Sequence, residues 1–330
     1  MNTLIETQVR LFASAHSWIE GEAVRQLYAI AMLDGVRRAV GFPDLHPGKG
    51  RPVGAAFVTE GVIYPHLIGG DIGCGMALFK TDLVRRDAKL DRWAALRFDL
   101  EHPWDGGVGD FLAERDLKST QSDSSLGTIG GGNHFAELQT VEKVLDADEF
   151  KKLELGKQQL VMLVHSGSRG LGESILRAHV DQQSGNGVAA DSFTGEEYLR
   201  GHDFAVRWAK ANRELIARRF VVKLGAEGEC LWDGCHNSIT SHENDGGFVW
   251  IHRKGAVVAD GEFVVIPRFT RLVELPRQTG WRWREPCLVA GSRCGPQVGR
   301  HRCSSADARA FWHAPTGADA AGWPRRLRRA

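Results

Sequence analysis

The segment GGDIGCGMALF, residues Gly69–Phe79, places one aspartate and one cysteine three residues apart among glycines, directly ahead of an apolar run. Two explanations fit these glycines. They could form a tight buried turn that tolerates no larger side chain, or they could leave room for a ligand, because glycine lets the backbone approach an ion or a phosphate closely. Asp71 and Cys74 are both metal-ligating residue types. The segment taken alone leaves both explanations open.

Hydrophobic periodicity on either side of this segment predicts helices, strands and the fold class. A helix is predicted over 22–34, with one apolar face formed by Val24, Leu27, Tyr28 and Ala31. A second is predicted over 203–219, with an apolar face formed by Phe204, Trp208, Ala211 and Leu215. Short apolar runs predict strands at 55–64, 159–164, 248–251 and 262–266. This pattern predicts an α+β domain with mixed sheets, flanking helices and functional loops at the strand ends.

Length and composition set broad limits on the class of protein. The chain has 330 residues, of which 42% are hydrophobic and 25% charged, as in a soluble globular protein with a large core. The net charge of +1 does not by itself indicate a nucleic-acid partner. No apolar run approaches the roughly 20 residues of a membrane span, and the first residues lack a signal-peptide pattern, so a cytoplasmic location is expected. Six cysteines without a CxxC pair predict neither a disulfide framework nor a zinc knuckle.

The segment 268–330 differs in composition from the rest of the chain. It contains thirteen arginines and no lysine, whereas all eleven lysines lie upstream. Three of the six cysteines and four of the ten tryptophans also fall here, without helical or strand periodicity. One interpretation is a basic RNA-binding tail. The other, which we favour, is a shifted reading frame in GC-rich coding DNA, which predicts a poorly ordered tail foreign to the upstream fold.

Several histidines stand beside glycine or small polar residues near predicted strand ends: His46, His134, His165, His236 and His252. A lone histidine is more often a core or surface residue than a ligand, but several in similar surroundings favour a metal site. With the oxygen of Asp71 and the sulfur of Cys74, they form a mixed donor set that suits Mn²⁺, Fe²⁺, Co²⁺ or Zn²⁺. A thiolate can also bridge two ions. The sequence alone does not choose the metal.

Two glycine-rich loops have features of phosphate-binding loops. HSGSRGLGES, at 165–174, follows an apolar run and precedes a possible helix, so its backbone amides and Arg169 could bind an anion. HRKGA, at 252–256, places Arg253 and Lys254 beside a glycine. Neither loop is a Walker A or a GxGxxG motif. The alternative for each is a solvated turn.

Taken together, six ordered motifs resemble those of the RtcB family, the GTP-dependent RNA ligases. The motifs are GFPDLHPGKGRPVG, GVIYPHLIGGDIGCGM, GGGNHFAELQ, HSGSRGLG, HN at 236–237 and HRKGA. The resemblance spans roughly residues 20–267 and implies a single catalytic domain over 1–267, incomplete at its end and built around a central dimetal cleft. It implies two Mn²⁺ ions and GTP as cofactors. The implied substrate is RNA with a 3′-phosphate or 2′,3′-cyclic phosphate end and a 5′-hydroxyl end, as in RNA repair and tRNA splicing.

The resemblance favours the second explanation for the glycines at 69–75, that they leave room for metal ions, and it implies a role for individual residues. Asp71, Cys74 and His134 match the ligands of one manganese, and Cys74, His165 and His236 match those of the second. Asn133 matches a residue near the nucleotide phosphate, and Glu137 one that recognises guanine, while Arg253 and Lys254 are further candidates for nucleotide binding. Arg169 would face the RNA phosphate. Asp44 and Cys74 match residues needed for activity, and Cys235 could support His236 or simply pack.

The family mechanism implied by the resemblance runs through a guanylylated histidine. That histidine attacks GTP, GMP passes to the RNA 3′-phosphate, and the 5′-hydroxyl then displaces GMP; a cyclic phosphate is hydrolysed first. This chain departs from the pattern after VVIP, at 264–267, and its nearest match to the later motif, VAGSRCG at 289–295, contains no histidine. We therefore expect a metal centre without its nucleophile. Two alternatives are a dimetal phosphoesterase and a non-catalytic RNA-binding protein; an accessory protein could also take part.

Overall fold

A computed structural model describes residues 8–13, 17–183, 187–244, 247–259, 263–265, 267–274 and 282–288. Its strands are β1 (Gln8–Leu11), β2 (Val36–His46), β3 (Val53–Glu60), β4 (Val62–Ile63), β5 (Gly75–Val84), β6 (Phe135–Thr140), β7 (Gln159–Ser166), β8 (Val188–Ala189), β9 (Gly228–Cys235), β10 (Asn237–Asn244), β11 (Gly247–Lys254), β12 (Pro267–Glu274) and β13 (Arg282–Leu288). Its α-helices are α1 (Gly21–Ala31), α2 (Pro65–Ile68), α3 (Leu90–Ala94), α4 (Val108–Ala113), α5 (Ala147–Lys152), α6 (Gly170–Gln183) and α7 (Phe193–Lys223).

Two larger sheets form the centre of the fold. The first sheet has the order β1-β2-β3-β11-β10 and is antiparallel except for the β1–β2 pair. The second sheet has the order β6-β7-β5-β9 and is antiparallel throughout. Strand β9 of the second sheet ends at Cys235 and strand β10 of the first begins at Asn237, so His236 is the single residue between them. A candidate site residue, His236, therefore lies at the junction of the two sheets.

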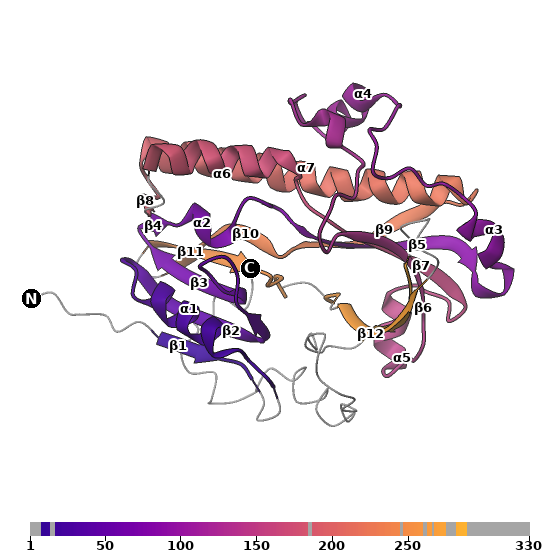
Figure 1. The fold of residues 1–330 in the computed structure, drawn as a ribbon, viewed down its shortest axis with the longest axis horizontal. Coiled ribbons are helices and arrows are strands. Elements are labelled where there is room, and N and C mark those ends of the chain that lie inside the picture. Colours follow the sequence, from indigo (N-terminus) through magenta and orange to yellow (C-terminus); the bar gives the residue numbers. More distant parts are fainter. Residues whose placement is uncertain are drawn as a thin grey trace, which may run out of the picture.

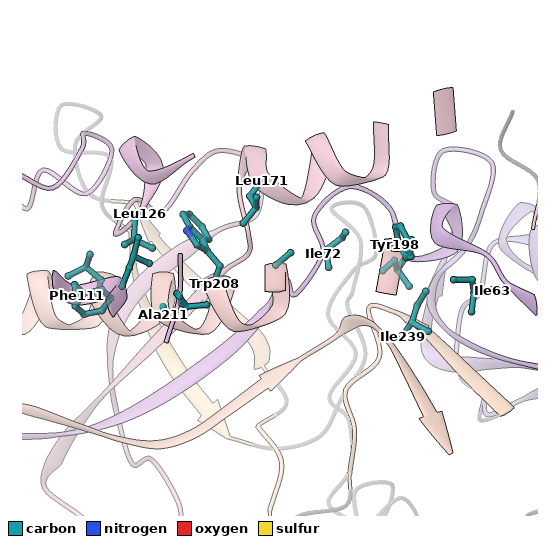
Figure 2. Close-up of a cluster of buried hydrophobic side chains, with 14 of the residues drawn as sticks. Ile63, Ile72, Phe111, Leu126, Leu171, Tyr198, Trp208, Ala211 and Ile239 are labelled. Atoms are coloured by element: carbon teal, nitrogen blue, oxygen red, sulfur yellow. The ribbon is translucent and has the colours of Figure 1, made fainter. Parts of the chain in front are cut away.

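The long helix α7 runs across both sheets and packs on strands of each (Figure 1). It begins after Ser192, whose Oγ accepts a hydrogen bond from the Gly195 amide at 3.1 Å. One hydrophobic cluster follows the helix from Phe111 and Leu126 to Tyr198 and Ile239, as Figure 2 shows. This continuous buried face fixes the position of the loops that pack on α7.

Three further clusters extend the core. Between the second sheet and α7 lies a cluster around Phe79, Met162 and Phe220. The opposite face of that sheet packs around Leu78, Val161 and Leu163. Helix α1 covers the first sheet through Ala23, Leu27 and Ile30. The fold is therefore a mixed α/β domain with several sheets and flanking helices, as the sequence predicted.

The structure corrects parts of the predicted secondary structure. The helix predicted at 22–34 is present as α1, but the prediction that Tyr28 lies on its buried face was wrong, because this side chain is 57% exposed. The helix predicted at 203–219 extends from Phe193 to Lys223; its first ten residues are mostly polar and show no apolar periodicity. The prediction of a strand at 262–266 was wrong for the part that the structure describes, because residues 263–265 form no strand.

The proposed boundary at residue 267 stays a prediction. Of the segment 268–330, only the backbone of 268–274 and 282–288 is described, and it belongs to the antiparallel pair β12–β13. The other residues of that segment, including His301 and His313, lie outside the described part. Across the described residues, no helix combines the length and apolar character needed to cross a membrane.

Candidate metal centre

The glycine-rich turn at 69–75 is held tightly against the protein. Ile72, between Asp71 and Cys74, is fully buried in the cluster along α7 (Figure 2). A Cβ on Gly73 would lie 2.9 Å from the Ala209 Cβ, and one on Gly75 would lie 2.2 Å from the Gly234 carbonyl oxygen. These two glycines therefore accommodate α7 and β9, not a ligand, which corrects the interpretation that they leave room for ions. The tight turn fixes the directions in which Asp71 and Cys74 point.

The first group of converging donors is Asp71, Cys74 and His134. Their ligand atoms all lie within 4.8 Å of one another. His134 Nε2 is 3.0 Å from Asp71 Oδ2 and 3.4 Å from Cys74 Sγ. His134 comes from the connection before β6, 60 residues after Cys74, so the fold brings distant segments together.

The second group is Cys74, His165 and His236, and it shares the cysteine with the first. His165 Nε2 lies 3.3 Å from Cys74 Sγ and 3.3 Å from His236 Nε2. His165 is near the end of β7, next to β5 in the second sheet, and His236 follows β9. The structure thus gathers all five residues that the sequence predicted as ligands, in the two groups that the resemblance implied.

The ring nitrogens of His134 and His165 are oriented for binding a cation. Their Nδ1 atoms lie 3.0 Å from the backbone carbonyl oxygens of Ile129 and Asn133 respectively. A carbonyl oxygen only accepts, so each Nδ1 carries a hydrogen, and in the neutral ring each Nε2 carries the lone pair that a metal would bind. The Nε2 atoms face the Asp71 carboxylate and the Cys74 sulfur, which is an acceptor once its thiol proton is lost. Such a convergence of acceptors fits a bound cation, and the mixed O, N and S donors suit a divalent transition metal such as Mn²⁺, Fe²⁺, Co²⁺ or Zn²⁺.

The electrostatics agree with a site that must lose protons to bind a metal. Burial, followed by the neighbouring Asp71 carboxylate, raises the pKa of the Cys74 thiol well above its usual range. Burial, followed by repulsion from His134, lowers the pKa of His165 to about 4. Burial and then His165 also lower the pKa of His236. The imidazoles of His165 and His236 are therefore neutral at pH 7, and metal binding would be coupled to release of the thiol proton.

Lys254, one of the predicted phosphate-binding cations, lies beside the turn that carries Asp71 and Cys74. Its ammonium donates a 2.8 Å hydrogen bond to the Ile68 carbonyl oxygen, just before the turn. Burial lowers its pKa, and the charges of Cys74 and Asp71 partly oppose that shift. Arg253 precedes it on β11 and so points to the opposite face of the strand, where its guanidinium donates to Thr240 Oγ1 at 2.7 Å. Because their side chains lie on opposite faces of β11, the strand geometry does not favour a shared role for Arg253 and Lys254.

Four other predicted residues surround the centre in different ways. Asn133 has an exposed side chain, and its carbonyl oxygen accepts from His165 Nδ1. Glu137 is buried on β6 and accepts from Gln139 Nε2 at 2.8 Å. Arg169 precedes α6 in a left-handed conformation with φ of 56°, near Thr128. Asp44 lies on β2 against Gly54. Their nucleotide, RNA and catalytic roles stay predictions.

Two buried polar residues behind the centre, Asn212 and Arg213, were not predicted from the sequence. Two more residues behind the centre, Cys235 and Asn237, lie beside and within the HN motif named from the sequence. The Asn237 side chain donates to the Asp71 carbonyl oxygen at 3.2 Å and accepts from the Gly255 amide at 3.0 Å. Cys235, for which the sequence left two interpretations, bonds through Sγ to the Gly73 carbonyl oxygen at 3.4 Å. The available signal was the pair Asn212–Arg213, which interrupts the apolar face of α7 between buried residues.

Two larger sheets, a covering helix and a convergent cysteine–histidine–aspartate cluster are the features of an α/β protein with a candidate metal centre. The family model described as "tRNA-splicing ligase RtcB" matches residues 26–124 and 107–274. The chain belongs to the RtcB family, a family of RNA ligases.

Three curated relatives illustrate the similarity. The chain is 42% identical to RNA-splicing ligase RtcB2 of Escherichia coli, over 77% of this chain and 67% of the relative. It is 29% identical to RNA-splicing ligase RtcB homolog 1 of Entamoeba dispar, over 82% and 63%. It is 30% identical to the tRNA-splicing ligase RtcB of Thermococcus kodakarensis, over 73% and 66%. The aligned part thus spans about two thirds of each relative's length.

Proposed function

We propose that this chain carries the dimetal centre of a Mn²⁺- and GTP-dependent RNA ligase. The reaction would join a 3′-phosphate or 2′,3′-cyclic phosphate end of RNA to a 5′-hydroxyl end, in RNA repair or tRNA splicing. The observation that carries the proposal is Cys74 Sγ, placed 3.4 Å from His134 Nε2 and 3.3 Å from His165 Nε2 in a chain of this family. A cytoplasmic location, predicted from the sequence, stays a prediction.

In this proposal each donor residue has a defined task. Asp71, Cys74 and His134 hold one Mn²⁺, and Cys74, His165 and His236 hold the second. The bound ions would neutralise phosphate charge and align the reacting groups, which is the larger part of phosphoryl-transfer catalysis. Lys254, whose ammonium lies beside the turn, would add a positive charge for a phosphate oxygen.

The remaining predicted residues would bind the nucleotide and the RNA. Asn133 and Glu137, on the connection into β6 and on β6 itself, are assigned to the GTP phosphate and to guanine. Arg169, at the start of α6, is assigned to the RNA phosphate, where backbone amides of the helix N-terminus add to its charge. Asp44 is assigned to catalysis and Arg253 to nucleotide binding on the strength of the resemblance alone.

A second candidate function follows from the segment at 289–295. VAGSRCG contains no histidine where the family motif has its nucleophile, so the chain as written would lack the guanylylation step. It would then act as a dimetal phosphoesterase that opens a cyclic phosphate without joining ends. A non-catalytic RNA-binding protein is the third candidate, supported by the Arg-rich composition of 268–330.

One assay separates the three candidates. The full chain is incubated with Mn²⁺, GTP and two RNA strands, one ending in a 2′,3′-cyclic phosphate and one beginning with a 5′-hydroxyl. Joined RNA supports the ligase, and an opened cyclic phosphate without joining supports the phosphoesterase. If neither product forms, RNA binding without catalysis is the candidate that remains. Radiolabelled GTP is added in parallel. We expect no covalent GMP adduct, and a stable adduct would show that another residue takes the place of the missing histidine.

A further inference from the structure

Two adjacent residues of α7, Asn212 and Arg213, are fully buried although both are polar. Their hydrogen bonds run to the segments that carry the metal-binding side chains. A buried guanidinium is costly unless it is paired and all its donors are used. The hydrogen bonds of both residues therefore show which contacts offset the free-energy cost of burying them.

Arg213 joins three of the ligand-bearing segments. Its Nη1 donates to the Gly73 and Ser166 carbonyl oxygens, each at 2.8 Å, and these residues flank Cys74 and His165. Its Nε and Nη2 form a bidentate pair with Asp233 at 2.7 and 2.6 Å, and Nη2 lies 3.5 Å from Cys235 Sγ, just before His236. One planar side chain thus fixes the distances between the strands that present Cys74, His165 and His236.

Asn212 holds the fourth segment against the same helix. Its Oδ1 accepts from the Gly127 amide at 2.7 Å, and its Nδ2 donates to the Thr128 carbonyl oxygen at 3.3 Å and to Ser166 Oγ at 3.1 Å. Ser166 Oγ in turn donates to the Ile129 carbonyl oxygen at 2.9 Å. That same carbonyl oxygen accepts from His134 Nδ1 and so orients the ring.

We propose that Asn212 and Arg213 are positioning residues that set the spacing of the four metal-binding side chains Cys74, His134, His165 and His236. The inference rests on the proposed metal centre and adds that its geometry is set from α7. Neither residue touches an ion or a substrate. Their role is to keep donors from four segments at the separations that two ions need, because outer hydrogen-bond partners fix ligand orientation.

The test measures Mn²⁺ binding to the full chain by isothermal titration calorimetry, with coupling between the two ions followed by electron paramagnetic resonance. Arg213→Lys keeps the charge but loses the planar fork, and Asn212→Asp keeps the Gly127 contact but loses the Nδ2 donors. We expect each variant to bind Mn²⁺ about 10–100-fold more weakly and with altered coupling between the ions.

The matched control is Arg115→Lys. Arg115 also pairs through two nitrogens with an α7 carboxylate, Glu214, with Nε 2.9 Å from Oε2, but its contacts lie away from the ligand-bearing segments. We expect this control to keep its Mn²⁺ affinity. Thermal melting in EDTA shows that each variant folds, and Asn212→Asp carries the test if Arg213→Lys does not fold.

Five outcomes are distinguishable. Weaker binding in the α7 variants with an intact control supports the inference. Unchanged affinity in folded Arg213→Lys and Asn212→Asp overturns it, as does an equal loss in the control. A wild-type chain that binds two ions but does not join RNA contradicts the ligase function and leaves the inference standing. A wild-type chain that binds no Mn²⁺ overturns both.

Discussion

Each of the two larger sheets buries a histidine near a strand end, and the two rings are used differently. His165 on β7 is 3% exposed and His252 on β11 is fully buried. Burial is the first cause that lowers their pKa values, to about 4 and about 3. Yet His252 Nε2 accepts from the Tyr64 amide at 2.9 Å, whereas His165 Nε2 faces Cys74 and His236. Burial and a low pKa do not identify a ligand; the partner of the accepting nitrogen does.

The contrast extends to the sheets themselves. The second sheet and the connections at its strand ends contribute Cys74, His134 and His165. The first sheet contributes the Lys254 ammonium, while His236 stands between the two sheets. One sheet would therefore bind the metal and the other would supply charge for the phosphate, and the following variants test that division.

The largest effect is expected from Cys74→Ala, because both groups share this sulfur. We expect Mn²⁺ affinity at both positions to fall by more than about 100-fold, since even outer partners of a ligand cost 10–100-fold. Calorimetric titration of the metal-free protein measures it. Cys230→Ala, at an exposed position on β9, should bind two ions normally. A Cys74→Ala protein that keeps one ion at wild-type affinity would show that the cysteine is not shared.

Lys254→Met tests the contribution of the first sheet. We expect GTP to bind about 10–100-fold more weakly, because a hydrogen bond to a charged group contributes about 1.5–3 kcal/mol. The number of bound Mn²⁺ ions should stay at two. Fluorescence titration with a GTP analogue measures the first quantity, and Lys151→Met, at an exposed position on α5, is the control. Equal nucleotide affinity in both variants would remove Lys254 from the phosphate site.

A pair of variants tests the two histidines directly. His252→Gln should lower the free energy of unfolding by about 1–3 kcal/mol, because the Tyr64 amide loses a buried acceptor, while two Mn²⁺ ions still bind. His165→Gln should instead lose the ion of the second group. Urea unfolding in EDTA and metal analysis after gel filtration separate these effects. Loss of an ion from His252→Gln would break the comparison.

The smallest effect concerns pH. His252 has a folded pKa of about 3 against an ordinary value of 6.5, so between these values the unfolded chain binds a proton that the folded protein does not. Stability therefore falls as pH falls through this window, by at most about 1.4 kcal/mol per pH unit for this one group. In His252→Gln this contribution is absent, so the two unfolding free energies should converge from pH 6 to pH 4 in EDTA. Parallel profiles would contradict the assignment.

The residues that converge at the centre could be named from the sequence because they lie in short contiguous motifs beside glycines, and their role as metal ligands stays a prediction. Apolar periodicity also identified α1 and the central part of α7. It failed for Tyr28, since that ring lies at the edge of the apolar face, and for the start of α7, whose first turns are polar. Arg213 could not be found this way, because its partners Gly73, Ser166 and Asp233 meet only through tertiary contacts.

The position of His236 between the sheets has a consequence for biosynthesis. His165 lies 91 residues after Cys74, and His236 follows His165 by another 71. The amide of Gly73, inside the turn itself, donates to the Asn237 carbonyl oxygen at 2.9 Å. A ribosome must therefore translate through codon 237 before the Asp71–Cys74 turn reaches its final form. Any metal acquired by the nascent chain before that point would meet an unfinished set of donors.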